Sequence, residues 1–338
     1  MGSPFVSVHM IAKENTNLGS RFLDSCFMSL HEAQYPNEIV FINNGCANFI
    51  MELVRDYWVS KFKEFDCELK IIDFLDNTDF CNLRNQCIFN TYENAHFMHW
   101  IDTDEVYYPE DLDVLKNHIM SDTVQISMIW TFFYHFIIDP FNVQADNKKT
   151  KKDHELGPND IRSIKDNVFG FHKGIRWRQE EKVHEHIDRK KEGVVLEASD
   201  CCYLHYGYIR HQWRIFLKWL HYAKLEFGNV NCYKLEGDPK REYFREDNIP
   251  TPNTIIEDRK KITVPYPNRV SIHQNLPEGA IKLINGCKNE QEWLEYLNKL
   301  DGNEFWLRWE DLYKKKGKWS ETLDEILEEC EKCNWSLV

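Results

Sequence analysis

The 338-residue sequence has no apolar run of the roughly 18 to 20 residues that a membrane-spanning helix needs. Its N-terminus enters an apolar, strand-like stretch without the basic and apolar segments of a secretory signal. It also has no excess of positive charge, because 42 Lys and Arg stand against 55 Asp and Glu, a net charge of −13. General DNA or RNA binding, which usually needs a basic face, is therefore disfavoured. We expect a cytoplasmic protein without a transmembrane segment, and a peripheral contact with a membrane stays open.

Several signatures of other enzyme classes are missing as well. Neither G-x-G-x-x-G nor a Walker-type loop occurs, which argues against dinucleotide oxidoreductases and P-loop enzymes. The G-x-S-x-G motif of α/β-hydrolases is also absent. The 11 cysteines are scattered and odd in number, so we interpret them as reduced thiols. Cys330 and Cys333 form a lone C-x-x-C, and a zinc site would need a second such pair.

The first hundred residues alternate between short apolar runs and segments with helical periodicity. Strands are expected at 5–12, 38–42, 69–74 and 96–101, and helices at 18–30, 49–65 and 80–92. This alternation predicts an α/β fold whose mostly parallel sheet is flanked by helices. Ligands of such sheets bind at the carboxyl ends of the strands, where this chain carries polar residues.

The pattern is less regular after residue 115. Further strands are expected at 124–133, 161–171 and 193–198, a polar surface loop at 139–160, a helix at 208–227, weak structure at 235–285, and helices near 289–300, 303–316 and 320–333. We therefore divide the chain into a domain at 1–225 and a C-terminal extension at 226–338 that is mostly helical after 288.

An apolar strand leads directly into carboxylates at Asp102-Thr103-Asp104-Glu105. On extended backbone, Asp102 and Asp104 would point the same way and could converge on one cation. Oxygen ligands suit Mn²⁺ or Mg²⁺, and such an ion can neutralise the charge on a departing diphosphate. An acidic turn that caps a helix beginning near Pro109 would have the same residues. We favour the metal site because the motif follows the fourth strand of the alternating half.

A second group of candidates surrounds Glu185. Arg176 and Arg178 could stabilise a departing diphosphate, and Glu185 could take the proton from an acceptor hydroxyl. On a strand, His184 and His186 would share one face and leave Glu185 on the other. Three interpretations therefore stay open: a histidine pair beside a metal, Glu185 alone beside the acceptor, and a solvated surface strand of mixed charge.

In this order the elements resemble GT-A-fold glycosyltransferases, particularly the family 2 type. The resemblance is carried by residues 6–15, 39–46, Arg84-Asn85 and Asp102-Thr103-Asp104, and it covers residues 5–115 well and 160–210 more loosely. It implies a nucleotide-diphospho-sugar transferase-like, mostly parallel sheet with the C-terminal helical extension added. The segment Val183-His184-Glu185 is similar to one that recurs in these enzymes, which supports Glu185 as the base.

The resemblance also implies roles for residues at the ends of the strands. Several would contact the nucleotide part of the donor, namely Ala12, Glu14, Asn43, Asn44, Arg84 and Asp102. The D-x-D element would hold the metal and the ribose, and His205 would complete the metal site. The family usually has Asp-Asp-Gly-Ser or Asp-Asn-Gly-Ser where this chain has Asn43-Asn44-Gly45-Cys46. Asn43 and Asn44 would equally suit a turn.

The implied activity is that of a metal-dependent glycosyltransferase, a hexosyl- or pentosyltransferase that works with Mn²⁺ or Mg²⁺. It would move a sugar from a UDP-, GDP- or dTDP-sugar donor to a hydroxyl of a glycan or other acceptor, with inversion. A sugar nucleotidyltransferase stays open as an alternative, although the loop after the first strand lacks the glycine run expected of one. A non-catalytic carbohydrate-binding protein of the same fold is the other alternative.

Overall fold

The computed structural model describes most of the first 144 residues and selected segments beyond them. The described residues are 5–75, 80–121, 126–144, 162–171, 175–177, 187–188, 194–211, 214–215, 260, 263–266, 276–301, 315 and 325. Within them, no helix has the length and apolar character needed to cross a membrane. The predicted domain division near residue 225 lies outside this part of the chain and stays a prediction.

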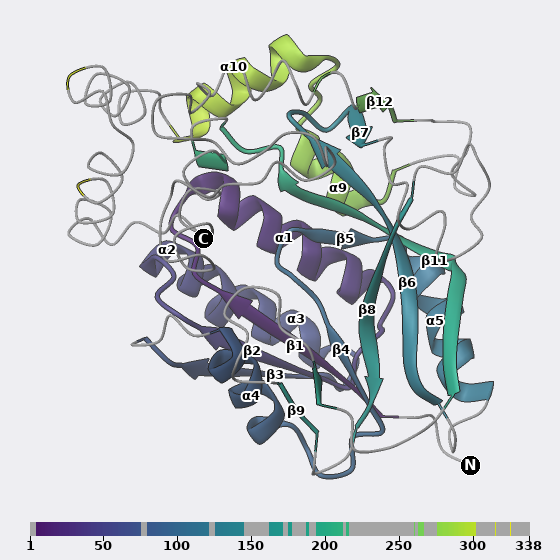
Figure 1. Ribbon diagram of the computed structural model, residues 1–338. Coiled ribbons are helices and arrows are strands. Elements are labelled where there is room, and N and C mark those ends of the chain that lie inside the picture. Colours follow the sequence, from purple (N-terminus) through teal and green to yellow (C-terminus); the bar gives the residue numbers. More distant parts are fainter. Residues whose placement is uncertain are drawn as a thin grey trace.

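The N-terminal half is a parallel sheet with helices between its strands (Figure 1). Its strands pair in parallel in the order β3-β2-β1-β4. The strands are β1 (Val6–Ala12), β2 (Glu38–Asn43), β3 (Glu68–Asp73) and β4 (Phe97–Trp100). The connecting helices are α1 (Asn17–Glu32), α2 (Asn48–Glu52), the π-helix η1 (Leu53–Trp58), α3 (Val59–Lys63) and α4 (Phe80–Asn90). The predicted alternation is confirmed.

Helices cover both faces of this sheet, which explains why its central strands are apolar on both sides. In β2, Ile39 and Phe41 pack into the cluster that contains Phe27 of α1. Val40 and Ile42 point the other way, into the cluster formed with α4. Every residue of β2 is buried, as expected for a strand covered on both faces.

The sheet continues beyond β4 through long strands from the middle of the chain. β8 (Ser163–Gly170) lies between β4 and β6 (Ile126–Ile137) and runs antiparallel to both, and β11 (Val194–Tyr208) pairs in parallel with β6. The short strand β5 (Glu105–Tyr107) pairs antiparallel with β11, and helix α5 (Pro109–Ser121) packs beside it. This arrangement brings the end of β4 close to β8 and β11.

Three expectations for the chain beyond residue 138 are wrong in part. β7 (Asn142–Gln144) falls in the expected surface loop, and β12 (Thr263–Pro265) and α9 (Glu278–Ile284) fall in the segment expected to be weakly structured. These strands form although the segments contain few apolar residues, because β7 and β12 pair with each other and Val143 is fully buried. The long strand β11 also extends to Tyr208, where the expected helix was to begin.

The C-terminal helices pack against the first helix of the chain. α9 and α10 (Glu290–Asp301) both contact α1 (Figure 1). Trp293 of α10 is fully buried, and its Nε1 donates a hydrogen bond to the carbonyl of Ile209 at 3.0 Å. The prediction of a helix at 289–300 is confirmed. Of the helices expected at 303–316 and 320–333, only Lys315 and Glu325 are described, and both are helical.

Candidate functional site

The acidic motif forms a turn between two strands. β4 ends at Trp100 and β5 begins at Glu105, whose backbone N–H donates to the carbonyl of Asp102 at 3.1 Å. Because the backbone turns here, the alternation of a strand does not apply to Asp102 and Asp104. Their carboxylates instead lie among different partners. The expected convergence on extended backbone is therefore replaced by two separate environments.

Asp102 is held by two donors. Its Oδ1 accepts a hydrogen bond from Trp100 Nε1 at 2.8 Å, and its Oδ2 lies 2.8 Å from the ammonium of Lys165 on β8. Partial withdrawal from water raises the pKa of Asp102, but the charges of Lys165 and Arg84 outweigh this and leave the pKa below its ordinary value. The carboxylate is therefore ionised, although its side chain is still 42% exposed.

Glu105 lies deeper than Asp102 and shares the same lysine. Its side chain is 1% exposed, and its carboxylate contacts Lys165 Nζ. Burial, reinforced by the charge of Asp102, outweighs Lys165 and raises the pKa of Glu105 to about 8. The pKa of Lys165 is raised because the pull of Asp102 and Glu105 exceeds the opposing effect of its own burial. These three groups form one polar cluster that is buried at Glu105 and partly exposed at Asp102.

A polar network supports this cluster from behind. Tyr107 Oη donates to Glu105 Oε2 at 3.4 Å and also lies 3.2 Å from His99 Nε2. Asn167 Nδ2 donates to Tyr107 Oη at 3.1 Å, and Thr131 Oγ1 donates to Asn167 Oδ1 at 2.8 Å. Burial holds the pKa of His99 well below its ordinary value, so its imidazole is neutral. Buried groups that are satisfied in this way fix the position of Glu105.

Asp104 faces a histidine on β11. Its Oδ1 lies 3.5 Å from His205 Nε2, and its backbone carbonyl accepts from the N–H of Tyr206 at 2.9 Å. Gly207 makes this approach feasible, because a Cβ there would stand 2.6 Å from Asp104 Oδ2 and 3.0 Å from His205 Nε2. The structure thus brings together Asp104 and His205, two residues that the sequence predicts to share a site.

His135 is a neighbour of this pair that the sequence analysis missed. It lies on β6 directly opposite His205, and the two ring centroids are 4.8 Å apart. Tyr208 is within 4.7 Å of His135, again measured between ring centroids. A histidine within an aromatic strand gives little signal by itself, since its pairing with β11 is invisible in the sequence.

Glu14 occupies a structural ion pair. Its two carboxylate oxygens accept hydrogen bonds from the guanidinium of Arg210, and Arg214 Nη2 adds a bond of 3.4 Å to Oε2. All three side chains are at most 6% exposed. Arg214 also donates to Thr16 Oγ1, the N-cap of α1. Glu14 thus links the loop after β1 to the segment after β11. The predicted contact of Glu14 with the nucleotide stays a prediction.

Asn43 and Asn44 shape the turn after β2. Asn43 Oδ1 accepts hydrogen bonds from the N–H groups of Gly45 and Cys46, and its Nδ2 donates to Asp73 Oδ1 at 2.7 Å. The N–H of Asn44 donates to the carbonyl of Ala12 at 2.8 Å, which ties the ends of β1 and β2 together. The turn-forming role is thus observed, and polar groups from three parallel strands meet at one edge of the sheet.

Arg84 and Arg176 lie beside aromatic rings on the same side as α4. The guanidinium of Arg84 is 3.8 Å from the ring centroid of Trp100 and 4.5 Å from that of Trp177. Arg176, on β9 (Arg176–Trp177), stacks on Phe89 at 4.8 Å. Short strand β9 pairs with β10 (Ile187–Asp188). The intervening candidates, Arg178, His184, Glu185 and His186, lie outside the described residues, so their roles stay predictions.

The donor set around Asp104 fits a hard divalent cation in part. Among the described residues, no group of three or more His, Cys, Asp or Glu side chains is arranged to hold a metal. Asp104 and His205 nevertheless offer one carboxylate and one imidazole, and within that same part of the chain Asp104 Oδ1 is buried without a hydrogen-bond donor. Mg²⁺ commonly takes one or two protein carboxylates and completes its shell with substrate phosphates and water. An oxygen and nitrogen pair is compatible with Mn²⁺ as well.

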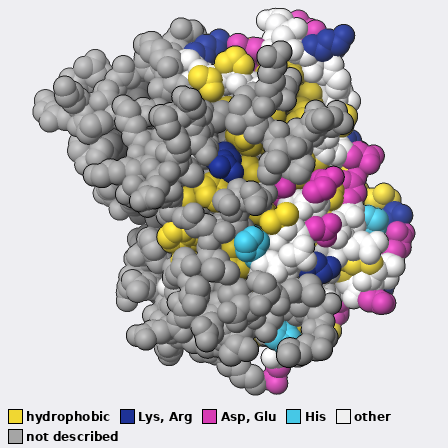
Figure 2. Space-filling view, turned by 90° about the vertical axis from the view of Figure 1, so that its right-hand side faces the viewer, with side chains coloured by type: hydrophobic (Ala, Val, Ile, Leu, Met, Phe, Trp, Pro, Cys, Tyr) yellow, Lys and Arg dark blue, Asp and Glu magenta, His cyan; other side chains and the backbone are white. Residues whose placement is uncertain are grey.

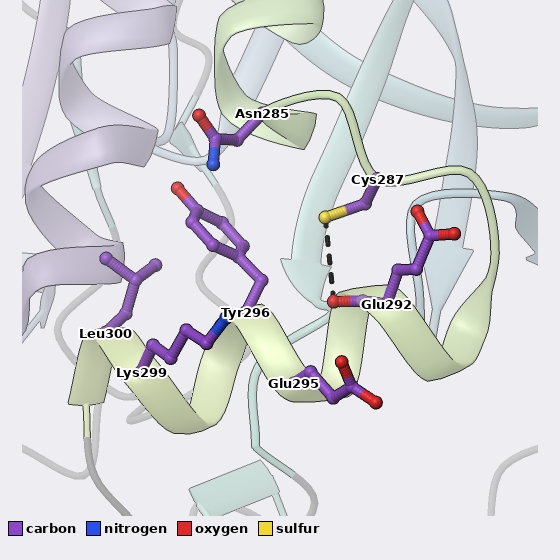
Figure 3. Close-up of a pocket in the computed structure, with 7 residues that line it drawn as sticks. All are labelled: Asn285, Cys287, Glu292, Glu295, Tyr296, Lys299 and Leu300. Atoms are coloured by element: carbon purple, nitrogen blue, oxygen red, sulfur yellow. Dashed lines mark hydrogen bonds between the residues drawn. The ribbon is translucent and has the colours of Figure 1, made fainter.

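A separate cavity of about 420 Å³ opens among the C-terminal helices (Figure 3). Its lining residues are Asn285, Cys287, Glu292, Glu295, Tyr296, Lys299 and Leu300. The Cys287 thiol donates to the carbonyl of Glu292 across 3.7 Å. The cavity shares no residue with the acidic site, and its lining has charges of both signs.

The described surface is predominantly acidic on one side. Figure 2 shows Asp and Glu side chains gathered along one edge of the face it presents, with few Lys or Arg side chains among them. This distribution agrees with the net charge of −13.

Comparison with known proteins gives no match to a family model or to a curated protein. The chain is similar to solved structures of TarS from S. aureus (TM-score 0.40, 14% identity, 68% of this chain and 42% of that one). It is also similar to the mannosyltransferase PcManGT from Pyrobaculum calidifontis in complex with GDP-Man and Mn²⁺ (0.30, 17%, 38% and 35%). A third similar structure is 4-diphosphocytidyl-2C-methyl-D-erythritol synthase from Anaerococcus prevotii (0.30, 10%, 50% and 72%).

The chain spans less than half the length of TarS and of the mannosyltransferase. At such identities and TM-scores these similarities carry no argument about activity. The fold is carried by the sheet itself, in which the parallel order β3-β2-β1-β4 is followed by one reversed strand, β8, and then by β6. The expected fold, a mostly parallel sheet flanked by helices, is confirmed.

Proposed function

We propose that the protein is a metal-dependent glycosyltransferase that moves a sugar from a nucleotide-sugar donor to an acceptor hydroxyl. The observation that supports this most is the Asp104–His205 pair. It lies at the carboxyl end of β4, where ligands of open α/β sheets bind, and the missing side chain of Gly207 allows Asp104 and His205 to approach each other. A carboxylate and an imidazole at this position would hold a divalent ion against a bound diphosphate.

In this proposal Asp104 and His205 hold Mn²⁺ or Mg²⁺. Once bound, the ion would supply positive charge to the diphosphate of the donor. Arg84 is close enough to Asp102 for its charge to lower the pKa of that carboxyl. We propose that Arg84 also adds positive charge near the diphosphate. Arg176 and Arg178 are proposed to steady the leaving group, and Asp102 to contact the donor.

The nucleotide would lie over the ends of the first three strands. Asn43 and Asp73 are hydrogen-bonded there, and Arg55 binds Asp73 at 3.0 Å. These amide, carboxylate and guanidinium groups could recognise the polar edge of a base. Ala12 and Asn44 shape the same edge.

The proposed reaction is a direct displacement with inversion. The acceptor oxygen forms a bond to the anomeric carbon while the bond from that carbon to the diphosphate oxygen breaks. Glu185 takes the hydroxyl proton, and the nucleoside diphosphate leaves with the bonding electrons. The donor would be a UDP-, GDP- or dTDP-sugar and the acceptor a glycan or other hydroxyl compound.

Donor hydrolysis tests the proposal. The full chain is incubated with UDP-, GDP-, dTDP- and CDP-sugars in the presence of Mn²⁺ or EDTA, and released nucleotide is measured. We expect release from one donor with Mn²⁺, loss of that release with EDTA and a loss of at least 100-fold in Asp104→Asn. The matched control is Asp113→Asn, which removes an exposed carboxylate on α5 and should leave the rate unchanged.

Other outcomes would favour the alternatives. Pyrophosphate release from a nucleoside triphosphate and a sugar phosphate would indicate a nucleotidyltransferase. Sugar binding by calorimetry, with no turnover of any donor and no metal-dependent nucleotide binding, would indicate a non-catalytic binding protein and refute the proposal.

A further inference from the structure

Lys165 places an ammonium group inside the acidic motif. It comes from β8, the reversed strand beside β4, and its Nζ lies 2.8 Å from Asp102 Oδ2 while also contacting Glu105 Oε1. Its side chain is only 23% exposed. The ammonium is therefore held between two carboxylates and is largely withdrawn from solvent.

This lysine makes the two aspartates of the motif unequal. Both oxygens of Asp102 already accept hydrogen bonds, one from Trp100 Nε1 and one from Lys165. Asp104 Oδ1 is buried, and in the described part of the chain no donor binds it, although His205 Nε2 lies 3.5 Å away. A second cation would be repelled near Asp102 and attracted near Asp104.

We infer that Lys165 is a positioning residue that withholds Asp102 from a divalent cation and directs the cation to Asp104 and His205. This inference rests on the proposed function. The inference goes beyond the proposed function because it assigns a role to Lys165, a residue outside the D-x-D element. It also gives Asp102 and Asp104 different roles.

The division has a consequence for the order of binding. One carboxylate and one imidazole leave most coordination positions of the ion to other oxygens. Asp104 and His205 alone would therefore hold the ion weakly, and we expect the ion and the donor to bind together, because the donor's diphosphate would supply the missing oxygens. Without the ammonium of Lys165, the uncompensated negative charge of Asp102 would also attract the ion, which would then be held more tightly in the absence of nucleotide.

Mn²⁺ binding to the full chain without nucleotide, followed by electron paramagnetic resonance, tests the inference. We expect Lys165→Met to bind Mn²⁺ at least tenfold more tightly than the wild-type chain. Lys165→Arg keeps the charge and should retain the weak binding. The gain should disappear in Lys165→Met combined with Asp102→Asn, because Asp102 carries the negative charge that the first change leaves uncompensated.

A merely structural role of Lys165 predicts weaker binding, not tighter binding. Equal or weaker Mn²⁺ affinity in a folded Lys165→Met chain would overturn the inference, and Lys165→Gln serves as the second neutral variant if the first does not fold. If Asp104→Asn leaves Mn²⁺ binding unchanged, the proposed metal site itself fails. If Asp104→Asn abolishes binding while both neutral variants match the wild type, only the role of Lys165 fails.

Discussion

Gly207→Ala is expected to damage the candidate site while leaving the fold intact. The new Cβ would stand 2.6 Å from Asp104 Oδ2, whereas ordinary contact begins at 3.4 Å, so the carboxylate must retreat by about 0.8 Å. The retreat is feasible because the obstructing atom is the end of a side chain and not backbone. The carboxylate would then leave the position that it shares with His205.

The size of the effect follows from this displacement. A misplacement of about 1 Å at a reacting centre can cost about 100-fold in rate, so we expect a loss of roughly 10- to 100-fold in metal-dependent donor hydrolysis. Metal affinity should fall by about tenfold, as when the support of a metal ligand is removed. The melting temperature should change little, because no buried backbone has to move.

Gly279→Ala is the matched control, because it should lower stability and leave metal binding unchanged, whereas Gly207→Ala should do the reverse. Its Cβ would stand 2.5 Å from the backbone carbonyl oxygen of Ser25, which belongs to α1 and cannot move independently. We expect a clear loss of thermal stability with unchanged Mn²⁺ affinity in the folded fraction. A Gly207→Ala chain with wild-type Mn²⁺ affinity and wild-type turnover would refute the reasoning that Asp104 and His205 form the metal site.

Two further predictions concern buried charge. Glu14→Gln leaves Arg210 and Arg214 buried without their counter-charge and should lower the free energy of unfolding in urea by about 3 to 5 kcal/mol, whereas Glu64→Gln, on the surface, should have no measurable effect. Burial lowers the pKa of His9 from 6.5 to about 3. The unfolded chain therefore binds the extra proton between these values, and stability that is complete above pH 6.5 is lost as the pH falls, by up to about 1.4 kcal/mol per pH unit. His9→Gln should flatten this slope in urea titrations, and an unchanged slope would contradict the assignment.

The secondary structure of the N-terminal half was predictable because it follows from the pattern of apolar residues within each short segment. Strands such as β2 are buried on both faces and show as apolar runs, and the helices between them show as periodic segments. The acidic motif was found for the same reason, since it follows an apolar strand directly. The turn-forming role of Asn43 was one of two that the sequence allowed, and the hydrogen bonds to Gly45 and Cys46 show that it is realised.

The partners of the motif could not be predicted in the same way. Lys165 follows Asp102 by 63 positions, and Glu14 is separated from Arg210 by 196, so neither pairing leaves a trace in local pattern. The three-residue strand β5 is also too short to show periodicity. Because β5 begins at Glu105, the preceding residues of the motif form a turn between β4 and β5. The sequence therefore located the acidic groups but not the lysine and arginine residues that pair with them.

That charge balance explains why a diphosphate would need a metal here. The chain is acidic overall, and three cations that the structure places near the ends of the strands already have acidic or aromatic partners. Lys165 binds Asp102 and Glu105, Arg210 binds Glu14, and Arg84 lies between two tryptophan rings. Using Lys165 or Arg210 alone to neutralise a departing diphosphate would leave uncompensated the carboxylates that they now balance. A divalent ion on Asp104 and His205, as proposed above, would add positive charge without breaking these pairs, so the metal dependence of nucleotide release is the most direct test of this site.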